Sequence, residues 1–180
     1  MPTWEIILII VAVVIAGFVL IVALQPSPFR IARSATMAAS PTTVFAQVND
    51  FHNWEGWSPW AKIDPTMTQS YEGAASGTGA KYAWHGKKVG QGRMTILDSR
   101  PHDLIVIKLE FLKPFQATNS AEFTFQPEGG QTRVTWSMSG QRNFMLKAFG
   151  LFMSMDKMLG REFEKGLAQM KAIAESVGSA

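Results

Sequence analysis

Five residues combine a titratable side chain with a position on or beside a predicted strand. They are Tyr71, Glu72, Tyr82, His85 and Glu110. Acid–base chemistry would require such a group to face an apolar cavity, where burial shifts its pKa. Glu110 alternates with Leu109 and Phe111, so its side chain is expected on the opposite, solvent-facing side of its strand. The set therefore gives weak support for an acid–base enzyme.

Motifs for metal or nucleophilic chemistry do not occur in the sequence. The three histidines, His52, His85 and His102, lack metal-ligand spacing, and the chain has no cysteine. There is no nucleophile elbow, phosphate-binding loop or paired His-Glu motif. We therefore expect no metal site, no cofactor and no catalytic residue, and a binding protein is favoured over an enzyme.

The charge of the chain gives little indication of a polyanionic partner. Its 180 residues carry 17 Lys and Arg against 14 Asp and Glu, a formal net charge of +3. The basic residues are scattered rather than gathered in one stripe, so nucleic-acid binding is not expected.

The N-terminal segment is apolar enough to enter a membrane. Residues 6–24 contain no charge, and their number is about that needed to cross a hydrocarbon core of roughly 30 Å as a helix. A cleaved signal peptide is the alternative, but no Lys or Arg precedes the run and no A-x-A site follows it. The sequence thus predicts a membrane anchor over 1–25, a proline-rich spacer over 26–28 and one soluble domain over 29–180.

The flanking charges predict the orientation of this anchor. Glu5 precedes the span, whereas Arg30 and Arg33 follow it closely. The positive-inside tendency then places the C-terminal bulk in the cytoplasm, attached to the inner membrane in a bacterium.

The soluble segment changes from short helices to strands along its length. A first strand is predicted over 29–37, and Ser40-Pro41 is typical of a helix start. Apolar and polar residues alternate in three later segments, 104–111, 118–126 and 132–139, and shorter candidates precede them at 67–72, 81–84 and 92–98. This order predicts an α+β fold with a curved antiparallel sheet of about seven strands, rather than a parallel sheet.

The last third of the chain repeats apolar residues at helical spacing. From 143 to 177 the apolar stripe includes Phe149, Phe152, Met153, Phe163 and Leu167. One long amphipathic helix is predicted there, with the stripe packed against the sheet.

Several short motifs together resemble one superfamily. They include Trp57-Ser58-Pro59-Trp60, Tyr71-Glu72-Gly73, Gly77-Thr78-Gly79, Trp84-His85-Gly86 and the segment 132–136. With the order of elements, they resemble the SRPBCC (START-like) superfamily over about 29–177, and within it the polyketide cyclase/dehydrase and lipid-transport group. The resemblance implies a helix-grip fold, with a deep cavity between the sheet and the C-terminal helix that takes apolar molecules.

If that cavity exists, its lining should come from the inward strand faces and the helix stripe. The predicted ligand-binding residues are Tyr82, Trp84, Met94, Ile107, Leu109, Phe111, Phe123, Trp136, Met138, Phe149 and Met153. Trp54, Trp57 and Trp60 would close the cavity mouth, lie against the bilayer, or pack down their own loop.

Three functions are compatible with these features. The favoured one is a membrane-anchored protein that binds a hydrophobic or amphipathic, lipid-like small molecule. The second is a cyclase-like enzyme acting on an aromatic or polyketide substrate, which would need an acid–base pair facing the cavity. The third is an interaction module without a ligand, which would have its cavity filled by Trp84, Phe111 and Trp136.

Overall fold

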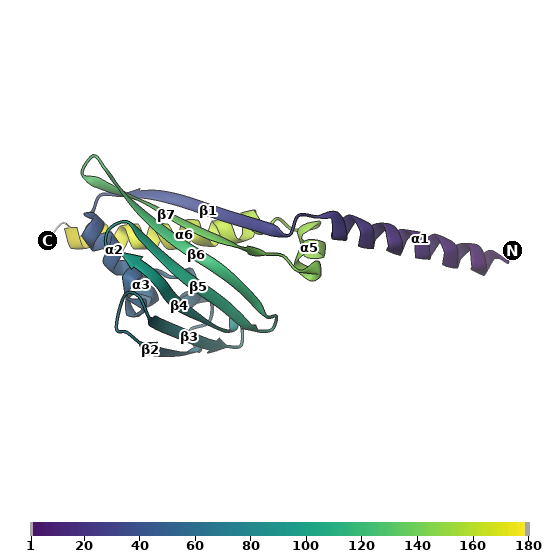
Figure 1. The fold of residues 1–180 in the computed structure, drawn as a ribbon, viewed down its shortest axis with the longest axis horizontal. Helices are drawn as coiled ribbons and strands as arrows, with labels where there is room; N and C mark the ends of the chain where they lie inside the picture. Colours follow the sequence, from purple (N-terminus) through teal and green to yellow (C-terminus); the bar gives the residue numbers. More distant parts are fainter. Residues whose placement is uncertain (1, 179–180) are drawn as a thin grey trace.

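The computed structural model describes residues 2–178 and consists of one projecting helix followed by an α+β unit (Figure 1). Residue 1 of the predicted anchor and residues 179–180 of the predicted domain lie outside the described residues. Helix α1 (Thr3–Leu24) comes first, and strands and short helices follow before the long C-terminal helix.

Seven antiparallel strands form one curved sheet in the order β1-β7-β6-β5-β4-β3-β2. Their bounds are β1 Pro28–Met37, β2 Thr68–Gly73, β3 Ala80–Gly86, β4 Gly90–Arg100, β5 Leu104–Lys113, β6 Ala117–Glu128 and β7 Gln131–Gln141. Ala121, Phe123 and Phe125 of β6 are buried, and so are Val134 and Trp136 of β7, as their alternation predicts. The predicted α+β helix-grip architecture is confirmed.

Short helices connect β1 to β2 and cover one end of the inner sheet face. They are α2 (Pro41–Asn49), the 3-10 turn η1 (Phe51–Asn53), α3 (Trp54–Trp57) and α4 (Pro59–Ile63). Ser40 caps α2 as predicted, because its side-chain oxygen accepts a hydrogen bond from the Thr43 backbone N–H at 3.2 Å.

The single long helix predicted over 143–177 is wrong. The structure instead has α5 (Phe144–Gly150) and α6 (Met155–Gly178), separated by a short turn. The break has local causes: Asn143 caps α5 through Leu146 N–H, and Ser154 Oγ accepts from Lys157 N–H at the start of α6. Apolar spacing continues through the break, which is why it was not apparent in the pattern.

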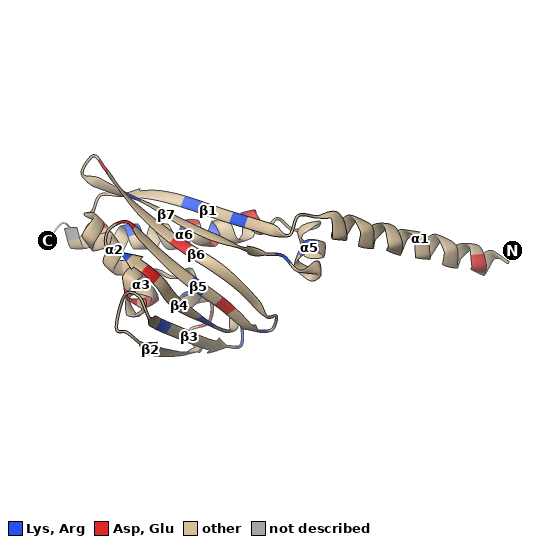
Figure 2. Cartoon of the chain, in the orientation of Figure 1, with Lys and Arg blue, Asp and Glu red and all other residues tan. Residues whose placement is uncertain are grey.

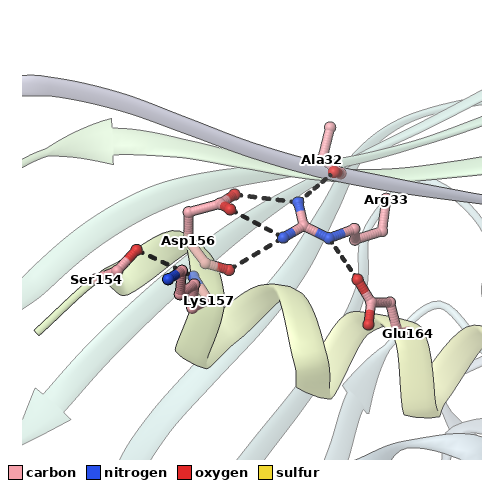
Figure 3. Close-up of polar contacts among 6 residues, drawn as sticks. All are labelled: Ala32, Arg33, Ser154, Asp156, Lys157 and Glu164. Atoms are coloured by element: carbon pink, nitrogen blue, oxygen red, sulfur yellow. Dashed lines mark hydrogen bonds and ion pairs between the residues drawn. The ribbon is translucent and has the colours of Figure 1, made fainter.

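Helix α6 packs along the concave side of the sheet and is fixed to β1 by a buried apolar face and an ion-pair network. Phe163, Leu167, Met170 and Ala174 are buried. At the start of the helix, Arg33 reaches across to two acids (Figure 3). Its Nε donates to Glu164 at 2.7 Å and its Nη2 to Asp156 at 2.9 Å, which lowers the pKa of the Asp156 carboxyl.

Gly160 makes this approach of Arg33 possible. A Cβ at position 160 would collide with the Arg33 guanidinium, so only glycine leaves room for the side chain to lie against the helix. The network therefore links α6 to β1 along one side of the sheet.

Helix α1 extends away from the rest of the molecule and exposes its apolar side chains over almost its whole length (Figure 1). Its 22 residues are long and apolar enough to cross a membrane. Within residues 2–178, the contacts of α1 with the rest of the chain lie in its last turn. Val22 is buried there, and Arg142 donates to the Pro26 carbonyl at 2.6 Å just beyond the helix.

Candidate ligand-binding site

A cavity of about 510 Å³ lies between the concave sheet face and α6. Most of the side chains around it are apolar or aromatic, and they come from all seven strands, from η1, α3, α4, α5 and α6, and from the connecting turns. Such a cavity falls in the size range of sites for small molecules.

Seven of the eleven residues predicted to bind a ligand border this cavity. They are Tyr82, Trp84, Met94, Leu109, Phe111, Trp136 and Met138. Trp84, Phe111 and Trp136 line the cavity rather than filling it, which removes the observation that would have favoured an interaction module.

Ile107 and Phe123 were predicted in the lining but are fully buried in the core instead. The rings of Trp54 and Trp57 lie 5.8 and 6.0 Å from the Phe123 ring and fill this part of the sheet's concavity. Strand alternation predicts correctly that these side chains point inward, but it does not indicate which part of the inner face the helices cover.

Phe149 and Met153 were also predicted in the lining, and this placement is wrong. Both side chains are exposed, Phe149 near the end of α5 and Met153 in the turn before α6. Because the predicted helix is interrupted at 151–154, the residues before the interruption no longer share the face of α6 that packs against the sheet.

The tryptophans of the 54–60 segment pack inward, so they do not lie against a bilayer. Trp54 and Trp57 are buried, and their indole N–H groups donate to the backbone carbonyls of Val48 and Gln47. Trp60 borders the cavity and packs edge-on against Trp136 at 5.6 Å. The sequence allowed three placements for these tryptophans. Trp54 and Trp57 take one of them, packing within their own loop region.

Several lining residues were missed by the sequence reasoning. Asn119 borders the cavity and has the same strand parity as Ala121 and Phe123, so alternation could have identified it. Leu146 and Phe115 come from α5 and the β5–β6 turn, and no periodic pattern indicates that these segments meet at the cavity.

A minority of the residues that border the cavity are polar or charged, and they come from strands, α3 and the connecting turns: Glu55, Ser58, Gln69, Tyr71, Tyr82, Lys88, Lys113 and Asn119. Tyr71 donates its hydroxyl to Gln69 Oε1 at 2.9 Å, and the Tyr71 ring lies 5.4 Å from that of Tyr82. Among residues 2–178, no side-chain hydrogen bond is made by the Tyr82 hydroxyl or the Asn119 amide, although both residues border the cavity. These two groups are available to orient a polar part of a ligand.

The tyrosines are poorly suited to act as bases. Burial, with smaller contributions from Tyr71 and Glu55, raises the pKa of Tyr82 to about 12. Burial also raises the pKa of Tyr71. A neutral phenol at pH 7 donates a hydrogen bond but does not abstract a proton at a useful rate.

The other three acid–base candidates named from the sequence, Glu72, His85 and Glu110, lie outside the cavity, whereas Glu55 of α3, which the sequence reasoning did not name, borders it. Glu110 is on the outer sheet face, as its parity predicts, where Arg93 and Lys108 bind it at 2.7 and 2.9 Å and lower its pKa to about 2. Glu72 and His85 are exposed and do not border the cavity.

Comparisons with known proteins agree with this architecture. No curated protein matches the chain. Solved structures share the fold at low identity. Protein CV1439 from Chromobacterium violaceum has 15% identity and a TM-score of 0.58, covering 83% of this chain and 99% of that one. The Aha1 dimer from Colwellia psychrerythraea has 13% identity and a TM-score of 0.59, covering 82% and 96%.

A third structure is longer than this chain. The di-domain ARO/CYC protein StfQ from the steffimycin biosynthetic pathway has 13% identity and a TM-score of 0.62. The alignment covers 86% of this chain and 53% of StfQ. At the level of sequence, the model of the family described as polyketide cyclase/dehydrase and lipid transport matches residues 28–175. Since this match takes in β1 to β7 and nearly all of α6, the chain belongs to that family.

Proposed function

We propose that this protein is a membrane-anchored binding protein for a hydrophobic or amphipathic small molecule of lipid-like character. In this proposal residues 1–25 form the anchor, 26–28 a short spacer and 29–180 the ligand-binding domain. The observation that carries it is the open, mainly apolar cavity of about 510 Å³ between the sheet and α6.

The size of the cavity limits the size of the ligand. An apolar cavity of about 150 Å³ holds one benzene molecule, so a 510 Å³ cavity has room for about three such rings, or on the order of 20 carbon atoms. Burial of each methylene contributes about 0.8 kcal/mol before the cost of association, which makes apolar burial the main source of affinity. Tyr82 and Asn119 would orient a polar head group.

The cyclase-like alternative has less support from the site. StfQ is an ARO/CYC protein, but its likeness to this chain concerns the fold. A proton-transfer enzyme needs a group with a pKa near the working pH. Among the five titratable candidates, only Tyr71 and Tyr82 border the cavity, and burial moves their pKa values away from neutrality.

A cytoplasmic position for the binding domain is part of the proposal. Besides Arg30 and Arg33, the side chains of Arg142 and Lys147 lie at the end of α1, where Lys147 Nζ is 3.5 Å from the Ala23 carbonyl oxygen. The positive-inside rule counts the charges close to the span in sequence, and there Arg30 and Arg33, against Glu5 on the other flank, favour the cytoplasmic side.

Native mass spectrometry of the full-length protein, released from detergent micelles, tests the proposal. Ala121 is buried and borders the cavity, whereas Ala83 lies on the opposite sheet face beside Arg93 and Glu110. Wild type and Ala83→Phe should retain the same bound apolar molecule, whereas Ala121→Phe, which fills about a third of the cavity, should retain at least about tenfold less.

The thermal stability of Ala121→Phe provides the folding control. Overpacking a filled core costs about 1–3 kcal/mol, whereas a ring placed into empty space should leave the melting temperature close to that of wild type. Equal loading of the two variants, or no bound molecule in wild type, would contradict the proposed function.

A further inference from the structure

The sheet has one end where α1, the cavity and three loops come together. The register pairs Pro28 with Gln141, Gly140 with Asn119, Phe111 with Ala117, and Gly86 with Gly90. The start of β1, the turns at 86–90 and 113–117 and the entry to α5 therefore lie along the same end of the sheet, and in Figure 1 the start of β1 and α5 lie beside the end of α1, with the two turns farther along this end. We refer to the two turns and residues 142–153 as the anchor-side end.

The cavity extends to this anchor-side end. Its border includes Lys88 and Val89 of the first turn, Pro114 and Phe115 of the second, and Leu146 of α5. Leu146 thus faces the cavity from the same helix that contacts α1.

The anchor-side end exposes a group of large apolar side chains to solvent. Phe152 is 79% exposed, Phe115 67% and Met145 65%. Phe144, Phe149, Leu151 and Met153 are also exposed, and none of the seven residues of α5 is fully buried. An exposed patch of this kind usually marks a surface that meets a partner or a membrane.

Charges at the anchor-side end are of one sign. Lys87, Lys88, Lys113, Arg142 and Lys147 lie in its three segments, and the sequence has no acid from 73 to 97, 111 to 121 or 129 to 155. Figure 2 shows basic but no acidic positions around α5 and the end of β7. Asp64 contacts the first turn, but it is buried and accepts the Lys88 backbone N–H at 2.9 Å.

Contacts with α1 fix the depth of α5 relative to a bilayer. Arg142 binds the Pro26 and Ser27 carbonyls through its side chain and its backbone N–H, and Lys147 reaches the Ala23 carbonyl in the last turn of α1. If α1 spans the bilayer, its last turn lies at the interface, so α5 is held at the level of the lipid head groups.

We infer that the anchor-side end docks on the surface of the bilayer that α1 crosses, with its apolar side chains in the interfacial layer and its basic side chains on anionic head groups. The cavity mouth then opens directly onto the bilayer. This inference rests on the proposed function and narrows its ligand class to a lipid of the same membrane, which enters without passing through water.

Site-specific fluorescence on the full chain tests the docking, because the native sequence has no cysteine. Single variants Phe115→Cys and Phe152→Cys would carry a small environment-sensitive dye, in vesicles of phosphatidylcholine with about one fifth phosphatidylglycerol and head-group-proximal quencher lipids. Gln131→Cys is the matched control, because Gln131 is exposed at the start of β7, beside the β6–β7 turn at the opposite end of the sheet.

Dyes at 115 and 152 should be quenched at least about twofold more than the dye at 131, and their quenching should fall when phosphatidylglycerol is omitted. Quenching at 115 and 152 equal to that at 131 would overturn the docking inference, even if wild type still retained a lipid by native mass spectrometry. Strong quenching at 115 and 152 with no retained lipid would support docking and overturn the proposed function instead.

Discussion

Replacing Phe163 by alanine tests whether α6 is held to the sheet by the aromatic contacts of the cavity wall. The Phe163 ring is 1% exposed and lies parallel to the Trp136 indole at a centroid distance of 4.2 Å, with Trp60 edge-on at 6.2 Å. Truncation of a buried phenylalanine costs about 3–5 kcal/mol. Because Phe163 borders the cavity, the lower value, about 3 kcal/mol, is expected.

Thermal unfolding of the full chain in detergent, followed by circular dichroism, measures this cost. For a protein of this size about 1 kcal/mol corresponds to about 2–4 °C, so Phe163→Ala should lower the melting temperature by about 6–12 °C. Leu97→Ala is the control, because Leu97 is exposed on the outer sheet face and should change the melting temperature by less than about 2 °C. A similarly small change for Phe163→Ala would refute the reasoning that this stack holds the helix over the cavity.

Three further predictions concern the cavity wall and the outer face. Tyr82→Phe should leave the melting temperature unchanged but lower ligand occupancy about fivefold in native mass spectrometry, because a lost hydrogen bond costs about 1 kcal/mol. Glu110 has a folded-state pKa of about 2 against an ordinary value of 4.5, so its stabilisation is present above pH 4.5 and is lost as pH falls towards 2. Urea unfolding should therefore show Glu110→Gln less stable than wild type at pH 6, with the difference closing near pH 2.5 and ligand occupancy unaffected. In Gly92→Ala the new Cβ would collide with the Trp84 ring and lie 2.6 Å from the Glu110 carbonyl oxygen. This clash should lower the free energy of unfolding by about 1–3 kcal/mol, measured by thermal unfolding. It should also reduce ligand occupancy, because it pushes the Trp84 indole into the cavity.

Sequence reasoning succeeded where one local rule determines the outcome. Alternation in β6 and β7 predicted the inward positions of Phe123 and Trp136. The same alternation in β5 placed Glu110 on the outer face. Ser40 was predicted as a helix cap because its side chain acts on its own backbone neighbours. These features depend on residues close together in the chain or on a strict period of two.

The cavity border required information that no single strand contains. Ile107 and Leu109 share one face of β5, yet Ile107 is buried in the core and Leu109 borders the cavity. The difference arises because the helices between β1 and β2 cover only one end of the inner face. How far their tryptophans reach depends on tertiary packing, so parity alone predicts the side of the sheet but not the boundary between core and cavity.

The misplacement of Phe149 and Met153 has a more general physical cause. An apolar stripe indicates that a face avoids water, but the same stripe results whether protein or lipid covers that face. In α6 the stripe meets the sheet at Phe163, whereas the continuation of the pattern remains exposed at Phe149 of α5 and at Phe152 in the turn after it. In our proposal the apolar residues that the sequence reasoning assigned to the cavity therefore face two environments: those of α6 face the sheet and the cavity, and those of α5 and the turn after it face the bilayer surface. Leu146, which borders the cavity from α5, lies where the two would meet.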